Sequence, residues 1–418
     1  MVVLTLLASI TNYASNIVFS RLLSAASYGD LTALTAFVVI AAVPTGAAQT
    51  IVAGRVAVLQ ADGDTNGVRY LIRHAAAHIA LIALILGVIY TACIPLVKTV
   101  LGLQTVGPAI ALAPLLVLAF FIPVAYGVLQ GMERFVALGA LMLASACSRL
   151  VIGLPWTLLA GGGAGGPLLG QAIGNLLALI ATAWLIREYM LRRGTGAASS
   201  GLRRRPDART LAAGGAFIAF ALISNLDVLL AKILLSAHAA GEYAALATIE
   251  KIVIFLPGAI AVVMVPSAAK ARHAEGSAAR VLRLAALLVV LTTMLVAVPA
   301  AIAPHFVLQT MFGAKYVRAA GGVLPIVCAG AGLALLYLLV VYTVAIQDRR
   351  WVWLLAGGVG LQIISISLLH SSPAEIAVVQ ASVIAIVLVV NELVFHPVLR
   401  AERLFASLAR RRAASVRL

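Results

Sequence analysis

Residues 15–34 read SNIVFSRLLSAASYGDLTAL, and residues 224–246 read SNLDVLLAKILLSAHAAGEYAAL. Each stretch is an apolar run that ends in a short turn of small and polar residues before a second apolar run begins. A shift of 212 positions superposes the two and pairs Ser24 with Ser236, Gly29 with Gly241, Asp30 with Glu242, Leu34 with Leu246 and, further on, Gly46 with Gly258. The pattern indicates one structural element that is built twice in the chain.

The composition excludes an ordinary soluble protein. Of the 418 residues, 63% are hydrophobic and only 11% are charged, and the mean hydropathy is +1.10. In soluble domains roughly a quarter of all residues are charged, because the surface must face water. Only a lipid bilayer tolerates such an excess of apolar side chains, so the sequence predicts an all-α integral membrane protein that crosses the membrane many times.

The apolar runs predict the number of spans, because a membrane helix needs about 20 mostly apolar residues. Twelve stretches qualify: 1–23, 31–59, 70–97, 106–130, 135–160, 166–189, 211–236, 243–269, 281–303, 319–346, 351–370 and 373–399. Because six is even, the second half enters with the same orientation as the first, so we expect two six-helix lobes related by a pseudo-twofold axis along the membrane normal. The predicted parts are an N-lobe (1–189), a basic linker (190–210), a C-lobe (211–400) and a basic tail (401–418).

Positive charge predicts the orientation. Most of the 30 Lys and Arg residues lie in the loops after the even-numbered spans and at the C-terminus, whereas the alternate loops hold only Lys98, Lys315 and Arg318, with Arg21 at their margin. By the positive-inside rule, both termini and the linker are cytoplasmic, in a cell membrane. The net charge of +16 then indicates contact with anionic lipids rather than with nucleic acid.

Three short motifs resemble a known family. The segments are FSRLLSAASYGDLTAL from Phe19, GVLQGMERF from Gly127 and MFGAKYVRAAGGVLPI from Met311. In order and spacing they resemble the multidrug/oligosaccharidyl-lipid/polysaccharide (MOP) exporter superfamily, in its Wzx-like oligosaccharide flippase branch. The resemblance implies a two-lobed fold that translocates a polyprenyl-pyrophosphate-linked oligosaccharide, a precursor of cell-surface polysaccharide, from the inner to the outer leaflet.

Two other functions compete with this interpretation. The first is a cation-coupled multidrug exporter of the same superfamily, whose cavity should be acidic or apolar rather than basic. The second is a membrane scaffold of a polysaccharide-assembly complex, which would use the basic linker and tail to dock other assembly proteins. An enzyme is disfavoured because the chain has no Gly-x-x-x-x-Gly-Lys-Ser/Thr loop, and no His or Cys spacing indicates a metal site.

Polar side chains at bilayer depth are the candidate site residues, because a charge there costs about 2.5–3.5 kcal/mol and faces a cavity or a partner. The candidates for binding the anionic head group and the sugar are Arg21, Arg149, Arg55, Asn12, Asn16, Gln49, Gln171 and Asn175. No cofactor is predicted. The candidates for coupling to H⁺ or Na⁺, or else for a salt-bridge cluster within the C-lobe, are Asp227, Lys232, Glu250 and Lys251.

The three candidate arginines differ in whether they can act as simple interfacial anchors of their helices. Arg21 and Arg55 lie near the ends of their predicted spans, so they can also act as interfacial anchors whose charged heads reach the water. Arg149 lies some fifteen residues into its span, where reaching water is difficult, so an inward orientation is expected. We therefore predict that Arg21 and Arg149 bind the anionic head group.

Overall fold

A computed structural model of the protein describes all residues except 160–162, 192–207, 271–276, 347–349 and 396–418. Over the described residues the chain forms helices and no strands. Ten of these helices are long and apolar enough to cross a membrane, and a bent pair adds an eleventh. Helix α12 (Ala237–Lys270) is a further helix of 34 residues. The helices follow the order of the predicted spans, so the all-α membrane fold is confirmed.

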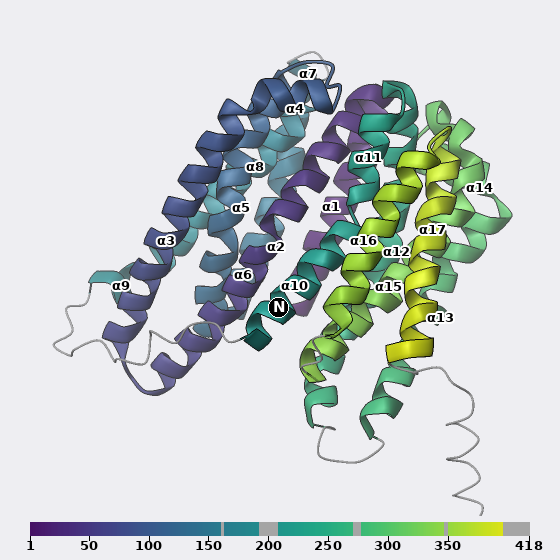
Figure 1. The fold of residues 1–418 in the computed structure, drawn as a ribbon. Helices are drawn as coiled ribbons and strands as arrows, with labels where there is room; N and C mark the ends of the chain where they lie inside the picture. Colours follow the sequence, from purple (N-terminus) through teal and green to yellow (C-terminus); the bar gives the residue numbers. More distant parts are fainter. Residues whose placement is uncertain (160–162, 192–207, 271–276, 347–349, 396–418) are drawn as a thin grey trace, which may run out of the picture.

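The first half of the chain forms one helical bundle, the N-lobe, drawn in purple and blue in Figure 1. Its helices are α1 (Val2–Leu22), α2 (Ala25–Ala61), α3 (Thr65–Ala92), α4 (Ile94–Val100), α5 (Gly107–Gly131), α6 (Phe135–Val151), α7 (Gly153–Leu159), α8 (Gly165–Leu185) and α9 (Arg187–Leu191). Its core on the side of α3 and α9 is made of apolar side chains such as Val56, Leu71 and Leu129.

The second half forms the C-lobe, drawn in teal to yellow in Figure 1. Its elements are α10 (Ala208–Ile223), α11 (Leu226–Leu234), α12 (Ala237–Lys270), α13 (Ser277–Ile302), α14 (Pro304–Met311), η3 (Ala314–Gly322), α15 (Val323–Ile346), α16 (Arg350–Leu368), α17 (Pro373–Val390) and η4 (Asn391–Phe395). Most of the predicted linker and all of the predicted tail lie outside the described residues, so their boundaries stay predictions.

The helix of the second predicted span in each lobe begins six residues earlier than predicted, at Ala25 for α2 and at Ala237 for α12. In both cases a serine precedes the helix, and its hydroxyl accepts a hydrogen bond from a backbone N–H in the first turn. Ser24 Oγ accepts from Ser27 at 3.1 Å, and Ser236 Oγ accepts from Ala239 at 3.4 Å. This N-cap satisfies a donor that the helix leaves free. The two serines occupy equivalent positions of the repeat.

Several predicted spans are divided into consecutive helices. The span over 211–236 is interrupted at Ser224–Asn225, where α10 ends and α11 begins. The span over 281–303 continues into α14, which is turned by 103° relative to α13 at a break of at most four residues. Hydropathy does not register such breaks, because both sides of each break are equally apolar. The break at Ser224 frees backbone carbonyl groups inside the membrane, where they need polar partners.

The two ends of the molecule differ. The C-terminal ends of α2, α5, α12 and α15 lie at one end, and α4, α7, α11 and α14 lie toward the other (Figure 1). We call the latter the closed end, because a buried core spans both lobes there and includes Phe19, Tyr28, Tyr243 and Tyr316. Orientation by positive charge predicts that the closed end faces outward.

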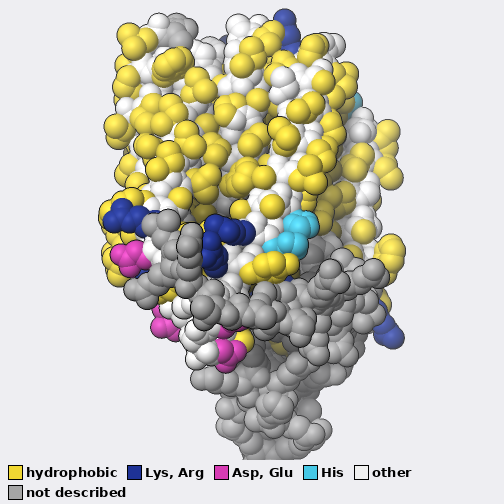
Figure 2. All heavy atoms as spheres, turned by 90° about the vertical axis from the view of Figure 1, so that its left-hand side faces the viewer, with side chains coloured by type: hydrophobic (Ala, Val, Ile, Leu, Met, Phe, Trp, Pro, Cys, Tyr) yellow, Lys and Arg dark blue, Asp and Glu magenta, His cyan; other side chains and the backbone are white. Residues whose placement is uncertain are grey.

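The sides of the bundle are apolar, as a bilayer requires. Figure 2 shows the face of the N-lobe around α3 as a broad field of hydrophobic side chains, with most of the charged and His side chains gathered toward one end. On α3, Leu81, Leu84 and Val88 are each about 60% exposed. Exposed apolar side chains on this scale mark contact with lipid. The protein is therefore a multi-pass membrane protein.

Candidate functional site

A cavity of about 500 Å³ lies between the two lobes. The N-lobe contributes α1, α2, α5, α6 and α8 to its lining, and the C-lobe contributes α10, α11, α12 and the break before α11. Six pairs of lining positions are related by the 212-residue shift: Asn12 and Ser224, Tyr13 and Asn225, Asn16 and Val228, Thr35 and Ala247, Ala36 and Thr248, Val39 and Lys251. The internal repeat therefore builds both walls of one cavity.

Arg149 supplies a fixed positive charge on the N-lobe wall. It extends from α6, and only 7% of the residue is exposed although it lines the cavity. No hydrogen bond or ion pair joins its guanidinium group to another residue in the part of the chain that the structure describes. A buried charge without a partner is unfavourable, so the geometry leaves Arg149 available to an anion in the cavity.

Amide side chains beside Arg149 are held in place by one another. Ser145 donates to Asn175 Oδ1 at 2.6 Å, and Gln171 Nε2 donates to Ser145 Oγ at 3.0 Å and to Asn175 Oδ1 at 3.3 Å. Asn12 and Asn16 line the cavity from α1, one helical turn apart. Amides and hydroxyls in this arrangement can donate to and accept from the hydroxyl groups of a sugar.

The C-lobe wall carries a second cation, Lys251 of α12. Its ammonium group donates to the carbonyl oxygen of Ser224 at the break between α10 and α11, and it lies 3.2 Å from Glu250 Oε2. Across the cavity, the Tyr13 hydroxyl donates to the Lys251 carbonyl at 3.1 Å. About a quarter of the Lys251 side chain is exposed, so it is reachable from the cavity.

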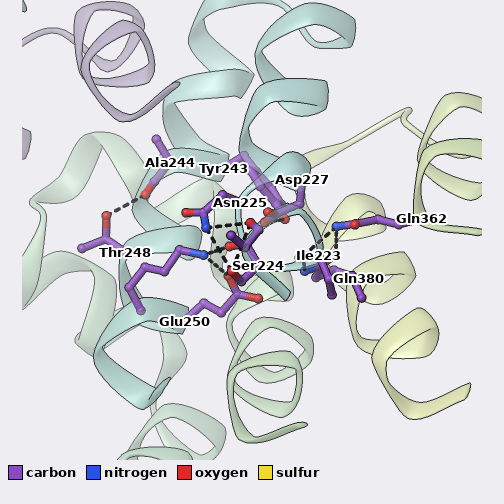
Figure 3. Close-up of polar contacts among 12 residues, drawn as sticks. Ile223, Ser224, Asn225, Asp227, Tyr243, Ala244, Thr248, Glu250, Gln362 and Gln380 are labelled. Atoms are coloured by element: carbon purple, nitrogen blue, oxygen red, sulfur yellow. Dashed lines mark hydrogen bonds and ion pairs between the residues drawn. The ribbon is translucent and has the colours of Figure 1, made fainter. Parts of the chain in front are cut away.

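Behind this wall lies a group of buried polar side chains. Figure 3 shows Asp227, Tyr243, Glu250, Gln362 and Gln380 around the break before α11. Tyr243 donates to Asp227 Oδ2 at 2.7 Å, and Gln362 and Gln380 each donate to the Ile223 carbonyl at 3.0 Å. One oxygen of each of Asp227, Glu250 and Gln362 is buried without a hydrogen-bond partner. These oxygens are candidates for holding a proton or a small cation.

The structure brings most of the predicted binding residues together. Arg149, Asn12, Asn16, Gln171 and Asn175 all line the cavity. The other three lie outside the described lining: Arg21, Arg55 and Gln49. Gln49 donates instead to Gln130 Oε1 of α5 at 3.4 Å. Hydropathy predicts the depth of a residue in the bilayer, but the side of the helix on which it lies depends on packing.

Arg21 joins the two lobes at the closed end. Its Nε donates to the Met311 carbonyl at 3.1 Å, and its second guanidinium nitrogen donates to the Thr310 carbonyl, both in the last turn of α14. In return, Lys315 donates to the carbonyl groups of Arg21 and Leu23 at the end of α1. Each lobe thus provides a cation for the free carbonyl groups at a helix C-terminus of the other, where positive charge is favourable.

Exchange of Arg21 for Ala is expected to affect the lobe contact and not the cavity. The side chain is exposed, so its loss should lower the free energy of unfolding by less than about 1 kcal/mol. Binding of inorganic pyrophosphate, measured by calorimetry, should stay within about twofold of the wild type. Lys315→Ala is the matched variant and should behave alike. A loss of pyrophosphate binding in Arg21→Ala alone would show that Arg21 does reach the bound anion.

Lys232 also joins the lobes, which corrects its expected place in a cluster within the C-lobe. It forms an ion pair of 2.6 Å with Asp30 of α2, and each side chain is only 2% exposed. Asp30 Oδ2 also accepts from the backbone N–H of Gln104 at 3.2 Å. Nearby, the Tyr28 and Thr248 hydroxyls are 2.7 Å apart, and Tyr316 donates to the Ser20 carbonyl at 3.0 Å.

Sequence reasoning missed several residues of the cavity and of the closed end. Tyr13, Thr35 and Thr248 line the cavity, and Asp30 pairs with Lys232 at the closed end. The repeat contained a usable signal for some of these, since Tyr13 and Thr35 are equivalent to the lining residues Asn225 and Ala247. Among the residues that the structure describes, no group of three or more His, Cys, Asp and Glu side chains is placed to hold a metal ion.

Comparison with known proteins identifies the fold. No family model and no curated protein matches the sequence. An inward-facing multidrug resistance MATE family transporter of the MOP superfamily matches with a TM-score of 0.67 at 15% identity, over 92% of this chain and 94% of the other. The lipid II flippase MurJ, in an inward closed conformation, matches with a TM-score of 0.66 at 12% identity, over 94% and 87%.

The conformations of the solved structures can also be compared. An outward-facing MATE transporter matches less well than the inward-facing one, with a TM-score of 0.55 at 15% identity over 93% of this chain and 91% of the other. Of these two, the inward-facing structure superposes on this chain with the higher TM-score. The chain thus shares the fold of these solved structures, as the sequence motifs implied.

Proposed function

We propose that this protein is a flippase that moves a polyprenyl-pyrophosphate-linked oligosaccharide from the inner to the outer leaflet by alternating access between its lobes. The proposal is supported by the fold, which solved transporters and a lipid flippase share. It is also supported by a polar cavity between two lobes that the repeat relates. A gap between two rigid bundles can open to either side when the bundles rock.

The observation that carries the proposal is the charge of the cavity lining. Arg149 and Lys251 face the cavity from opposite walls, and the described lining contains no Asp or Glu. The planar guanidinium of Arg149 can make paired hydrogen bonds to phosphate oxygens, while the ammonium of Lys251 acts as a point charge. The site therefore suits a pyrophosphate, with the amides placed for the sugar and the polyprenyl tail left in lipid.

A multidrug exporter is the second candidate, and the MATE structures are the observation that favours it. Exported drugs that are cations would be attracted by carboxylates or aromatic faces. The described lining contains two aromatic side chains, Tyr13 and Phe220, but no carboxylate, and the buried Asp227 and Glu250 lie behind the wall. Charge complementarity thus favours an anionic substrate.

We also infer that transport is coupled to H⁺ or Na⁺ in the C-lobe. The buried oxygens of Asp227 and Glu250 that lack a hydrogen-bond partner support this inference. In the same proposal the protein resides in the cell membrane with both termini in the cytoplasm, contacts anionic lipids there, and hands its substrate to other polysaccharide-assembly proteins.

The function is tested by reconstitution of the purified protein in vesicles. A fluorescent polyprenyl-pyrophosphate glycan is placed in one leaflet, and its exchange to the other is followed by quenching from outside. We expect exchange that depends on the protein and no transport of cationic dyes. Dye transport without lipid exchange would favour the multidrug exporter, and absence of both would favour the scaffold.

Exchange of Arg149 for Ala is expected to lower flipping about 10- to 100-fold at limiting substrate, since a hydrogen bond to a charged group contributes about 1.5–3 kcal/mol. Arg149→Lys keeps the charge but loses the planar fork, so it should fall between Ala and the wild type. Arg73→Ala, on the exposed face of α3, is the control. Wild-type flipping by well-folded Arg149→Ala would place the anion site elsewhere.

A further inference from the structure

Lys251 and Glu250 are neighbours in the sequence but belong to different environments. Successive residues of a helix point about 100° apart, so Lys251 reaches the cavity while Glu250 is fully buried behind it. The Lys251 ammonium bends back toward the same side, to Glu250 Oε2 at 3.2 Å and to the Ser224 carbonyl. Lys251 is therefore a direct connection between the cavity and the buried carboxylates.

The buried group has more negative than positive charge when its carboxylates are ionised. Asp227 and Glu250 are both 0% exposed, and Lys251 is the cation in contact with Glu250. Asp227 is contacted by the neutral hydroxyl of Tyr243. A buried carboxylate without a counter-charge is strongly unfavourable. Any movement of Lys251 away from Glu250 therefore increases the affinity of the group for a proton or a small cation.

Arg149 and Lys251 differ in what an arriving anion must displace. Arg149 has no hydrogen-bond or ion-pair partner within the described residues, so it can bind an anion without giving up a contact. Lys251 must exchange a carboxylate for the anion. Its ammonium is carried on a flexible stem with three rotatable donors, which permits such an exchange without movement of α12.

From this arrangement, and on the basis of the function proposed above, we infer that Lys251 is a coupling residue. With the cavity empty, its ammonium pairs with Glu250 and the Ser224 carbonyl. With a pyrophosphate bound, the ammonium turns to a phosphate oxygen, and Glu250 takes up one H⁺ or Na⁺ in its place. No covalent bond changes, and one positive charge enters the buried group for the one that leaves. Binding of the anion and of the cation therefore strengthen each other, and linkage makes this effect reciprocal.

The test uses the purified full-length protein and farnesyl pyrophosphate, a short probe without sugar, in binding calorimetry at constant pH and ionic strength. Glu250→Gln removes the charge that holds Lys251, so it should bind the probe roughly fivefold or more tightly than the wild type, in the range of typical coupling between sites. Lys251→Met should bind it more weakly. Glu242→Gln, on the same helix but paired with the exposed His238, is the control and should change little.

Two further arms identify the cation. If Na⁺ is taken up, replacing Na⁺ by N-methylglucamine should weaken probe binding by the wild type and leave Glu250→Gln unchanged. If H⁺ is taken up, titrations in buffers of different ionisation heat should show more proton uptake for the wild type than for Glu250→Gln, which corrects for protonation of the probe itself.

The outcomes separate the two proposals. No probe binding by the wild type would refute the anionic substrate. Probe binding by the wild type, with Glu250→Gln no tighter, would refute only the coupling role of Lys251. Should Glu250→Gln fail to fold, Asp227→Asn removes a negative charge from the same group and is subject to the same criterion.

Discussion

Exchange of Lys232 for Met is expected to destabilise the closed end by about 3–5 kcal/mol, the usual cost of removing one partner of a buried ion pair. Asp30 would remain 2% exposed without its counter-charge. Because the pair joins the two lobes, the protein can avoid this cost by separating them at this end. We therefore expect a shift of the population toward a state in which the cavity is open at the closed end.

The shift can be measured by labelling a cavity residue from outside. A cysteine at Thr35 lines the cavity from α2, and it is introduced into a protein in which Cys93, Cys147 and Cys328 are replaced. A membrane-impermeant maleimide added to intact cells should react faster with the Lys232→Met variant than with its parent.

Two variants serve as controls. The double exchange Asp30→Leu with Lys232→Met removes both charges and should recover most of the stability, since replacing a buried pair by apolar residues is often neutral. Glu242, the repeat equivalent of Asp30, pairs at 3.6 Å with His238, whose side chain is 57% exposed; Glu242→Gln should have little effect. Unchanged labelling and melting of Lys232→Met would contradict a closing role for the pair.

Exchange of Gly241 for Ala is expected to have the second largest effect, again at the closed end. The repeat-equivalent glycines Gly29 and Gly241 bring α2 and α12 into contact, and a Cβ atom on Gly241 would overlap the carbonyl oxygen of Ala25. Backbone atoms cannot move aside as a flexible side chain can, so the helices must separate. Overpacking of this kind costs about 1–3 kcal/mol, and labelling of the Thr35 cysteine should rise.

Glycines along α2 and α12 allow a graded control. A Cβ atom on Gly29 would lie 3.1 Å from the Gly241 backbone nitrogen, a milder contact, and one on Gly46 would meet no atom within 4 Å. Labelling should therefore increase in the order Gly46→Ala, Gly29→Ala, Gly241→Ala. Gly46→Ala should match its parent or gain slight stability from its higher helix propensity. Equal labelling of all three would show that α2 and α12 do not limit access at this end.

The spans and the repeat were predictable because both can be recognised from short runs of neighbouring residues. A membrane helix needs a certain length of apolar residues wherever it lies in the chain, and the bilayer forces its backbone to be helical. The shift that superposes Gly29 on Gly241 also relates the cavity positions Asn12 and Ser224. The break at Ser224–Asn225 was not predictable in this way, because partners from α12, α16 and α17 satisfy the freed carbonyl groups.

The candidate site was predictable where depth alone decided it. Arg149 lies too far into its span to reach water, and Asn12 and Asn16 share one face of their helix. Arg21, which lies near a helix end, contacts α14 and lies outside the described lining, which the sequence did not indicate because depth leaves open the direction in which a side chain points. That direction depends on α14, nearly 300 residues later in the chain.

The sequence by itself determined the class of the protein, its spans, its repeat and the presence of a charge that must face a cavity. Tertiary structure decided which charges meet: Asp30 with Lys232 across the lobes, and Lys251 with Glu250 beside the cavity. The physical reason is the separation along the chain over which each interaction acts. Hydropathy and helix capping act over a few neighbouring residues, whereas an ion pair forms wherever packing of distant helices brings two side chains within about 4 Å of each other.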